Sequence, residues 1–421
     1  MWEKVRRIWK TRKLRNSILF VLGMLVAFRL VAHIPIPGVD VAALRNFLAG
    51  NQIFGLLNMF SGGTIENFSI AMLGVGPYIT SSIIFQLLAM VVPSLEEMQK
   101  EGESGQRKIN MYTRITTVPL AILQAFSLIQ LLRQSGSGIV PDLSVFHFVA
   151  ITLIVTAGTL FLMWIGELIT DQNIGNGVSI IIFAGIVSGL PKVIQNALIN
   201  YNPADLYTYL VFIFIAIITV IGVVIISEGQ RNIPVSYARQ SRGGYGGAQS
   251  KLPLRVNTAG VIPIIFAVSV MLVPATIGQF FVYKQGVVAE VAKTVVALFQ
   301  NQLFYGIVYF LMVFAFTYFY TAVIFHPQKI AENLQRQGGF IPGIRPGKQT
   351  EEYVGKTMTR LVFIGALFLA LIAVLPLIFQ AFTHTQSLAL GGTSLLIVVS
   401  VAIDMAKQIE AQLTMYEYDR V

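Results

Sequence analysis

Ionisable side chains that could carry out acid–base or ion-coupling chemistry are sparse in the long apolar runs of this sequence. Arg29, Glu167 and Asp404 are the main ones. Glu167 and Asp404 stand towards the ends of their runs, where we expect interfacial water to solvate them. Arg29 lies deeper, and we expect its long side chain to extend towards the nearer surface. A proton- or sodium-coupled transporter usually places carboxylates or histidines in mid-membrane, so this distribution argues against one.

Catalytic and metal-binding patterns are absent from the sequence. The four histidines stand at the edges of apolar runs: His33, His147, His326 and His384. No run offers a Ser/His or Asp/Asp pair for proteolysis, or two histidines spaced for a metal. No phosphate-binding loop occurs, and there is no cysteine. We therefore predict that the chain is not an enzyme, binds no metal and needs no cofactor.

The composition is that of an integral membrane protein. Hydrophobic residues make up 55% of the 421 residues and charged residues only 12%, against about a quarter charged in soluble chains. Runs near ~20 residues match the thickness of the hydrocarbon core, and continuous rather than alternating runs indicate helices. We predict an all-α integral membrane fold with ten transmembrane helices, at about 17–36, 69–93, 112–132, 147–169, 177–194, 207–227, 258–282, 303–325, 357–379 and 388–411.

The basic residues fix the expected orientation. Of the 30 lysines and arginines, 24 lie in the two termini and in the loops 95–114, 228–257 and 326–360, and five lie in the alternate loops. Short loops rich in lysine and arginine stay in the cytoplasm. Both termini are therefore expected to be cytoplasmic, as an even number of spans requires.

A short apolar run at 53–60 does not fit a plain bundle. It is too short to span, it ends in Ser61-Gly62-Gly63-Thr64, and it precedes the second predicted span on the outer side. Irregular backbone at membrane depth requires surrounding protein or water. The run is either a re-entrant half-helix that folds into a cavity or a helix that lies flat on the membrane surface.

The ten predicted spans divide into two sets of five. The halves, 1–200 and 201–421, would enter the membrane with opposite orientations, as inverted repeats do. We find no clear sequence similarity between them. The two long basic loops, 228–257 and 326–360, both lie in the second half and are too long for simple connections. We interpret them as docking surfaces.

Several predicted spans contain small or amide side chains that would make their helix interfaces easy to separate. Gly175-Asn176-Gly177 and Gly391-Gly392-Thr393 open two of them, and Gln86 and Gln124 interrupt two others. Small residues permit close helix packing, and amides can form hydrogen bonds across a helix interface worth about 0.6–2 kcal/mol. Interactions of that size suit an interface that opens.

Six motifs follow one another along nearly the whole chain. They are Gly76-Pro77-Tyr78-Ile79 running through Gln86-Leu87-Leu88, Lys100-Glu101-Gly102-Glu103-Ser104-Gly105, Ile174-Gly175-Asn176-Gly177, Gly260-Val261-Ile262-Pro263, Pro342-Gly343-Ile344-Arg345-Pro346-Gly347 and Gly391-Gly392-Thr393-Ser394-Leu395-Leu396-Ile397. In these motifs and in their order the chain resembles the SecY family, the channel subunits of the bacterial Sec protein translocase. The resemblance covers essentially the whole length.

The resemblance implies a central hourglass pore between the two halves, closed at its waist by a ring of aliphatic side chains. By motif position the ring residues are Ile79, Ile83, Val178, Ile182, Ile265 and Ile397. Two of the pairs are spaced four residues apart, so each pair shares a helix face. An aliphatic ring can exclude water and ions, yet it offers a passing chain no hydrogen bonds to break.

The resemblance also assigns a plug, a gate and a docking loop. Segment 53–67 matches the plug that closes the outer funnel, with Phe54, Leu57, Phe60, Ser61, Gly62 and Gly63 as its residues. The second and seventh spans match a lateral gate to lipid, with Gln86 and Gln124 near its seam. Arg345 matches a family arginine that contacts the motor ATPase SecA or the ribosome, since a guanidinium suits acidic protein and RNA phosphate alike.

One departure from the family concerns the 228–257 loop. The family often carries adjacent basic residues at its tip, whereas this chain has Arg242-Gly243-Gly244-Tyr245-Gly246-Gly247. Arg239 and Arg242 can compensate, or the glycine run can mean a different docking contact.

The expected function is that of a passive protein-conducting channel in the bacterial cytoplasmic membrane. It would pass unfolded polypeptides across the membrane or sideways into lipid, driven by SecA or the translating ribosome, with SecE and SecG as small partner subunits. The rival from another class is a secondary transporter of a small solute, which would need a polar pocket in mid-membrane. A weaker rival is an insertase scaffold without a pore.

Overall fold

Long helices form most of the structure, a computed structural model. It describes residues 2–37, 39–49, 58, 61–134, 144–199, 206–237, 250–260, 262–282, 286–383 and 386–418. A helix lies over each predicted span: α2 (Arg12–Ala32), α5 (Gly76–Val91), α7 (Glu103–Gln134), α8 (Val145–Thr170), α9 (Gly177–Ile199), α10 (Leu206–Glu228), α11 (Ile262–Val282), α13 (Gln302–Ile324), α15 (Lys348–Thr383) and α16 (Gln386–Tyr418).

Five helical stretches in the described part of the chain are long and apolar enough to cross a membrane by themselves. They are Arg12–Ala32, Glu103–Arg133, Val145–Thr170, Gln302–Arg336 and Lys348–Leu375. A sixth is the pair formed by α5 and α6 (Pro93–Lys100), which bends by 105° at its break. Pro93 explains that break, since proline disfavours helical backbone in the residue before it. The chain is thus a multi-pass membrane protein.

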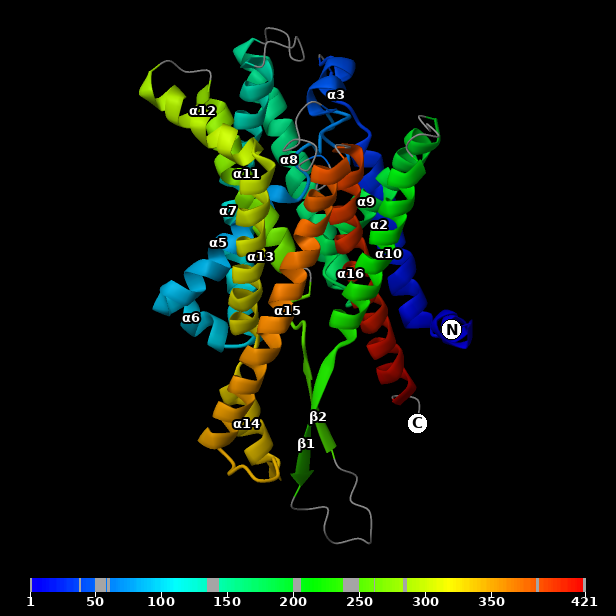
Figure 1. Ribbon diagram of the computed structural model, residues 1–421, viewed down its shortest axis with the longest axis vertical. Helices are drawn as coiled ribbons and strands as arrows, with labels where there is room; N and C mark the ends of the chain where they lie inside the picture. The colour runs from blue at the N-terminus through cyan, green and yellow to red at the C-terminus, as the bar shows by residue number, and fades with distance from the viewer. Residues whose placement is uncertain are drawn as a thin grey trace.

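The shorter helices lie at the ends of the long ones. They are α1 (Trp2–Lys10), α3 (Val41–Ala49), α12 (Val287–Gln300) and α14 (Pro327–Arg336). Figure 1 shows α3 and α12 at one end of the bundle, and α14 and a β-hairpin at the other. The two chain ends lie on the side of the hairpin (Figure 1).

The predicted start of the second span, residue 69, is wrong by seven residues. Residues 61–75 form a series of hydrogen-bonded turns, and α5 begins only at Gly76. Four residues with positive φ interrupt helical backbone there: Gly62, Gly63, Phe68 and Gly74. Pro77 in the first turn then favours helix initiation. Apolar composition alone could not reveal this, because residues 69–75 are as apolar as the helix that follows.

A three-stranded antiparallel sheet is the exception to the predicted all-helical fold. Its strand order is β2 (Ser250–Arg255), β1 (Gln230–Tyr237), β3 (Gly339–Phe340). In the register, Ile233 pairs with Leu252 and Ser236 with Phe340. The sheet therefore joins the two long basic loops, which the sequence analysis treated separately, into one unit.

Three hydrophobic clusters hold the described residues together. The largest lies among the long helices of both halves and contains the predicted ring positions. A second packs α3 and the turns after residue 61 against α7 and α8. The third lies between the sheet, α14 and the start of α15, and includes Ile233, Leu334 and Val354. The basic loops thus have a small core of their own.

Candidate functional site

The predicted ring residues gather in the central cluster. Each of five isoleucines is at most 6% exposed: Ile79 and Ile83 on α5, Ile182 on α9, Ile265 on α11 and Ile397 on α16. Val178, one turn before Ile182, is half-buried and packs against the same cluster. Helices α5 and α11 pack together, as do α9 and α16. Four helices from both predicted halves therefore contribute aliphatic side chains to one buried cluster.

The turns at residues 61–75, here called the cover segment, are held by backbone and side-chain hydrogen bonds. The buried Thr64 hydroxyl donates to the carbonyls of Ser61 and Met72, at 3.0 and 3.3 Å. The Ile36 amide donates to the Phe68 carbonyl at 2.9 Å. An irregular backbone inside a membrane protein must satisfy its polar groups in this way.

Half of the predicted plug residues belong to the start of the cover segment. Ser61 and Gly62 are buried and Gly63 is half-buried, and both glycines have φ of +78°. That conformation suits glycine and few other residues. Phe54, Leu57 and Phe60 lie outside the described residues, as does nearly all of the run 53–60.

Two glycines let the cover segment lie directly against α9. A Cβ on Gly62 would lie 2.9 Å from the Gly185 Cα and 3.0 Å from the Phe28 ring. Gly158 on α8 makes a similar close approach to the Ile70 carbonyl. Backbones approach this closely only where side chains are missing, so α8 and α9 are shaped to receive the segment.

Arg29 on α2 joins the cover segment to α9. Its Nη1 donates to the Gly62 carbonyl at 3.0 Å, and its Nη2 donates to the carbonyls of Ala184 and Gly185 at 3.1 and 3.0 Å. The guanidinium also lies 5.2 Å from the centre of the Phe28 ring. From the sequence, Arg29 was expected to extend towards the outer face of the membrane, and these protein partners were not foreseen. Sequence reasoning missed these contacts because all three acceptors are backbone oxygens.

The predicted gate amides lie on neighbouring helices. Gln86 on α5 donates from Nε2 to Ser82 Oγ at 3.0 Å, and its Oε1 is buried with no hydrogen-bond partner among the described residues. Gln124 is half-buried on α7. Helix α11 packs against both α5 and α7. No hydrogen bond joins the two amides within the described part of the chain, so their role at a gate stays a prediction.

The predicted docking arginine stands on an exposed turn. Arg345 lies between β3 and α15, and its carbonyl accepts from Thr350 Oγ1 at 2.9 Å. Gly343 and Gly347, with φ of +82° and +96°, shape the turn on either side. Its side chain is therefore presented at the surface of the sheet unit. Arg239 and Arg242 lie outside the described residues.

Two ion pairs tie helices together near the predicted cytoplasmic side. Glu167 on α8 pairs with Arg114 on α7, so a partner as well as solvent stabilises its charge. Lys407 on α16 lies 3.0 Å from a Glu228 carboxylate oxygen and donates to the Ser227 carbonyl at 2.7 Å. A lysine at the end of α10 also complements the helix dipole.

A polar pocket of about 220 Å³ lies beside the central cluster. The starts of α9 and α11 and the middle of α16 line it, and the Asp404 carboxylate belongs to its lining. Asn257 Oδ1 and Thr258 Oγ1 are buried there without a hydrogen-bond partner among the described residues. A pocket lined by a carboxylate and by unpaired amide and hydroxyl oxygens is suited to hold water rather than apolar groups.

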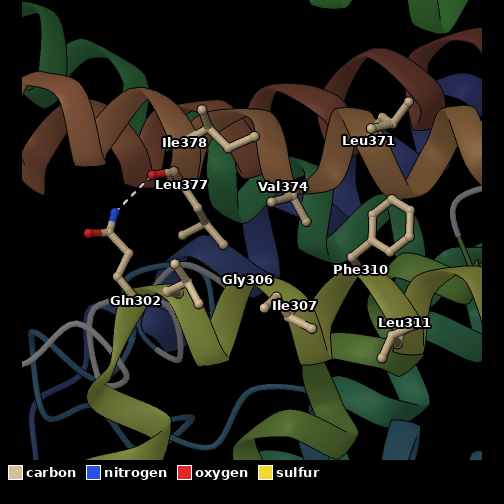
Figure 2. A pocket seen from close by; sticks show the side chains of 10 residues that line it. Gln302, Gly306, Ile307, Phe310, Leu311, Leu371, Val374, Leu377 and Ile378 are labelled. Atoms are coloured by element: carbon tan, nitrogen blue, oxygen red, sulfur yellow. Dashed lines mark hydrogen bonds between the residues drawn. The ribbon is translucent and has the colours of Figure 1, made fainter.

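A larger cavity, of about 520 Å³, is apolar and lies between α13 and α15. Figure 2 shows its lining side chains and the hydrogen bond, 2.8 Å long, from Gln302 Nε2 to the Leu377 carbonyl. Leu303, Ile307 and Leu371 in this lining are more than half exposed on the bundle's outer surface. The cavity therefore opens on the outer surface of the bundle, and none of the predicted ring residues lines it.

No group of three or more His, Cys, Asp or Glu side chains that could hold a metal occurs in the described ranges. Fold and site together define a membrane protein with long helices packed around a buried apolar cluster. The SecY family model matches residues 69–406. The chain belongs to the SecY family.

Protein translocase subunits from several bacteria are similar to this chain over nearly their whole length. Protein translocase subunit SecY of Halalkalibacterium halodurans is 44% identical over 99% of both chains. The subunit of Bacillus subtilis is 43% identical over 99% of both chains. The subunit of Thermotoga maritima is 40% identical over 100% of this chain and 97% of its own length.

Solved channel structures share the fold. A structure described as that of a protein-conducting channel superposes with a TM-score of 0.66 at 18% identity, over 93% of this chain and 91% of the other. Sec61 in a canine ribosome–channel complex gives 0.62 at 17% identity, with the same coverage. At these identities the likeness concerns the fold.

Proposed function

We propose that this chain is the channel-forming subunit of a protein translocase. It passes unfolded secretory polypeptides across the bacterial cytoplasmic membrane and releases transmembrane segments into lipid through a lateral gate. One observation carries the proposal: five buried isoleucines from four helices belong to one hydrophobic cluster that also contains Ala71 and Val75 of the cover segment, in a chain 44% identical to a protein translocase subunit.

The ring would act as a hydrophobic constriction. Water leaves a narrow aliphatic passage readily, so ions meet a barrier there. A polypeptide can push the side chains apart without breaking hydrogen bonds, and the aliphatic chains then close around it. The polar pocket lined by Asp404, beside the ring, would form part of a hydrated vestibule on the cytoplasmic side.

The finer architecture belongs to the proposal. The ten helices would each cross the membrane, in inverted halves 1–200 and 201–421 around an hourglass pore, with both termini cytoplasmic. The cover segment and the run 53–60 before it would form the plug. The basic loops support this orientation, and Figure 1, where both chain ends lie on the hairpin's side, is consistent with it.

Energy would come from partners. The sequence has no phosphate-binding loop. The exposed Arg345 and the sheet unit below the bundle would dock SecA or the ribosome, with Arg239 and Arg242 contributing from the sequence between β1 and β2. Ribosome-bound Sec61 and Ssh1 complexes are among the proteins that share the fold. SecE and SecG subunits would accompany the chain, which would itself catalyse no reaction and need no cofactor.

Reconstitution tests the function. Proteoliposomes that contain the chain, its small partners and an energised motor should protect a secretory precursor from external protease, and protection should require the signal sequence. The rival transporter, for which the comparisons give no support, predicts saturable uptake of a small solute. Solute uptake without precursor protection would contradict the proposal.

A further inference from the structure

The hydrogen bonding of Arg29 is unusual for a cation inside an apolar bundle. All three acceptors are neutral backbone carbonyls, from Gly62 of the cover segment and from Ala184 and Gly185 of α9. A desolvated guanidinium needs such partners, because burying a charge without hydrogen bonds is very costly. Its planar fork reaches two elements at once, which a single ammonium group does less well.

Where Arg29 binds, the cover segment and α9 meet through their backbones rather than through interlocking side chains. Gly62 faces Gly185 with no Cβ on either residue. Interdigitating side chains cannot fix the register of two backbones there. The guanidinium bridges this contact from α2, so it supplies the specific interaction that the glycines lack.

We propose that Arg29 is a positioning residue that latches the cover segment onto α9 and so favours the closed channel. The inference rests on the proposed channel function. In the closed state the latch lies in a water-poor site, where its charge-assisted hydrogen bonds are strong. When a substrate opens the channel and water enters, water replaces the three carbonyls and the segment moves away. The arginine thus stabilises closure without locking it.

The test is the ion leak of the reconstituted complex in planar bilayers, without substrate. Arg29→Met keeps an apolar stem and removes the donors. We expect its leak to rise about tenfold to a hundredfold, because the variant loses the three charge-assisted hydrogen bonds of the guanidinium and keeps the other packing of the segment. Arg29→Lys should leak to an intermediate degree. Arg45→Met is the matched control, because Arg45 contacts the same segment through Glu66, at 3.3 Å, but forms no hydrogen bond or ion pair with α9 among the described residues. It should leak like wild type.

A second measurement does not depend on reconstitution. A single cysteine at Ser61, which is 6% exposed, can be labelled in membranes with an impermeant maleimide added from the outer side. We expect labelling to be slow in the wild-type background and at least about tenfold faster with Arg29→Met. If Arg29→Met does not assemble, Arg29→Gln serves in both assays.

The outcomes separate the latch from the channel function. Wild-type leak and wild-type labelling in an Arg29 variant that still translocates precursor would overturn the latch. A wild-type complex that translocates no precursor would instead contradict the proposed function, and the labelling of Ser61 would still decide whether Arg29 holds the segment.

Discussion

Gly62 of the cover segment and Gly185 of α9 are in direct backbone contact. A Cβ on Gly185 would lie 2.5 Å from the Gly62 Cα, closer than real Cβ contacts come. The segment that lies against α9 beside the apolar ring therefore depends on the absence of two methyl groups.

Substitution of Gly185 tests this contact. Gly185→Ala should displace the cover segment and raise the resting ion leak, because the neighbouring atom is backbone and cannot rotate away. Gly189, one turn later on α9, has nothing within 4 Å of its Cβ position. Gly189→Ala should therefore leave the leak unchanged and, by helix propensity, stabilise α9 by about 0.5–1 kcal/mol. Equal leaks in bilayer recordings of the two variants would contradict the packing argument.

If the aliphatic ring is the barrier to ions, a polar substitution in it should raise ion conductance more than a change of side-chain shape does. Ile397 is 1% exposed in the central cluster. Ile397→Asn should wet the constriction and raise ion conductance, whereas Ile397→Leu, of nearly equal volume, should not. Conductance in planar bilayers distinguishes them. A leak of the same size in both variants would mean that the shape of this residue, not its hydrophobicity, forms the barrier.

The half-satisfied amide of Gln86 predicts a change in gating. Because its Oε1 is buried without a partner among the described residues, Gln86→Leu should stabilise the closed packing of α5 by about 1 kcal/mol. Precursors with weak signal sequences should then translocate about fivefold more slowly, measured by protease protection. Gln106→Leu, at an exposed site on α7, is the control. Faster translocation in Gln86→Leu would contradict this prediction, because it would mean that the amide stabilises the closed packing of α5.

The docking prediction concerns Arg345. Arg345→Ala should reduce motor- or ribosome-driven translocation severalfold and leave the ion leak unchanged, since the turn lies outside the bundle. Arg345→Lys should restore it only in part if the contact is bidentate. Arg336, also exposed on the sheet unit, provides a control of equal charge. An equal loss in Arg336→Ala would indicate non-specific attraction to positive charge.

The sequence predicted the long helices well, because runs such as that of α8 (Val145–Thr170) carry a strong and uniform signal. It placed the start of α5 wrongly, because residues 69–75 are as apolar as the helix that follows. It did not reveal the sheet that joins the two basic loops. Strand pairing between β1 and β3 links residues about a hundred positions apart, and local pattern does not encode such contacts.

The candidate site divides in the same way. The ring residues could be assigned through family motifs, and the structure brings them into one cluster. The contacts of Arg29 could not be foreseen, because its partners are carbonyls, which every residue has. Backbone acceptors, and close glycine contacts such as that of Gly62 with Gly185, leave no pattern in the sequence and become visible only in the three-dimensional structure.

The path of the polypeptide is the central claim, and the lack of cysteine in the native sequence allows a direct measurement. A single cysteine at Ile182, buried in the ring, should cross-link to a secretory precursor stalled during translocation in proteoliposomes with the partner subunits. The adduct should form only when the signal sequence is functional. No adduct, together with protection of the same cysteine from labelling by a small solute, would contradict a polypeptide path through the ring.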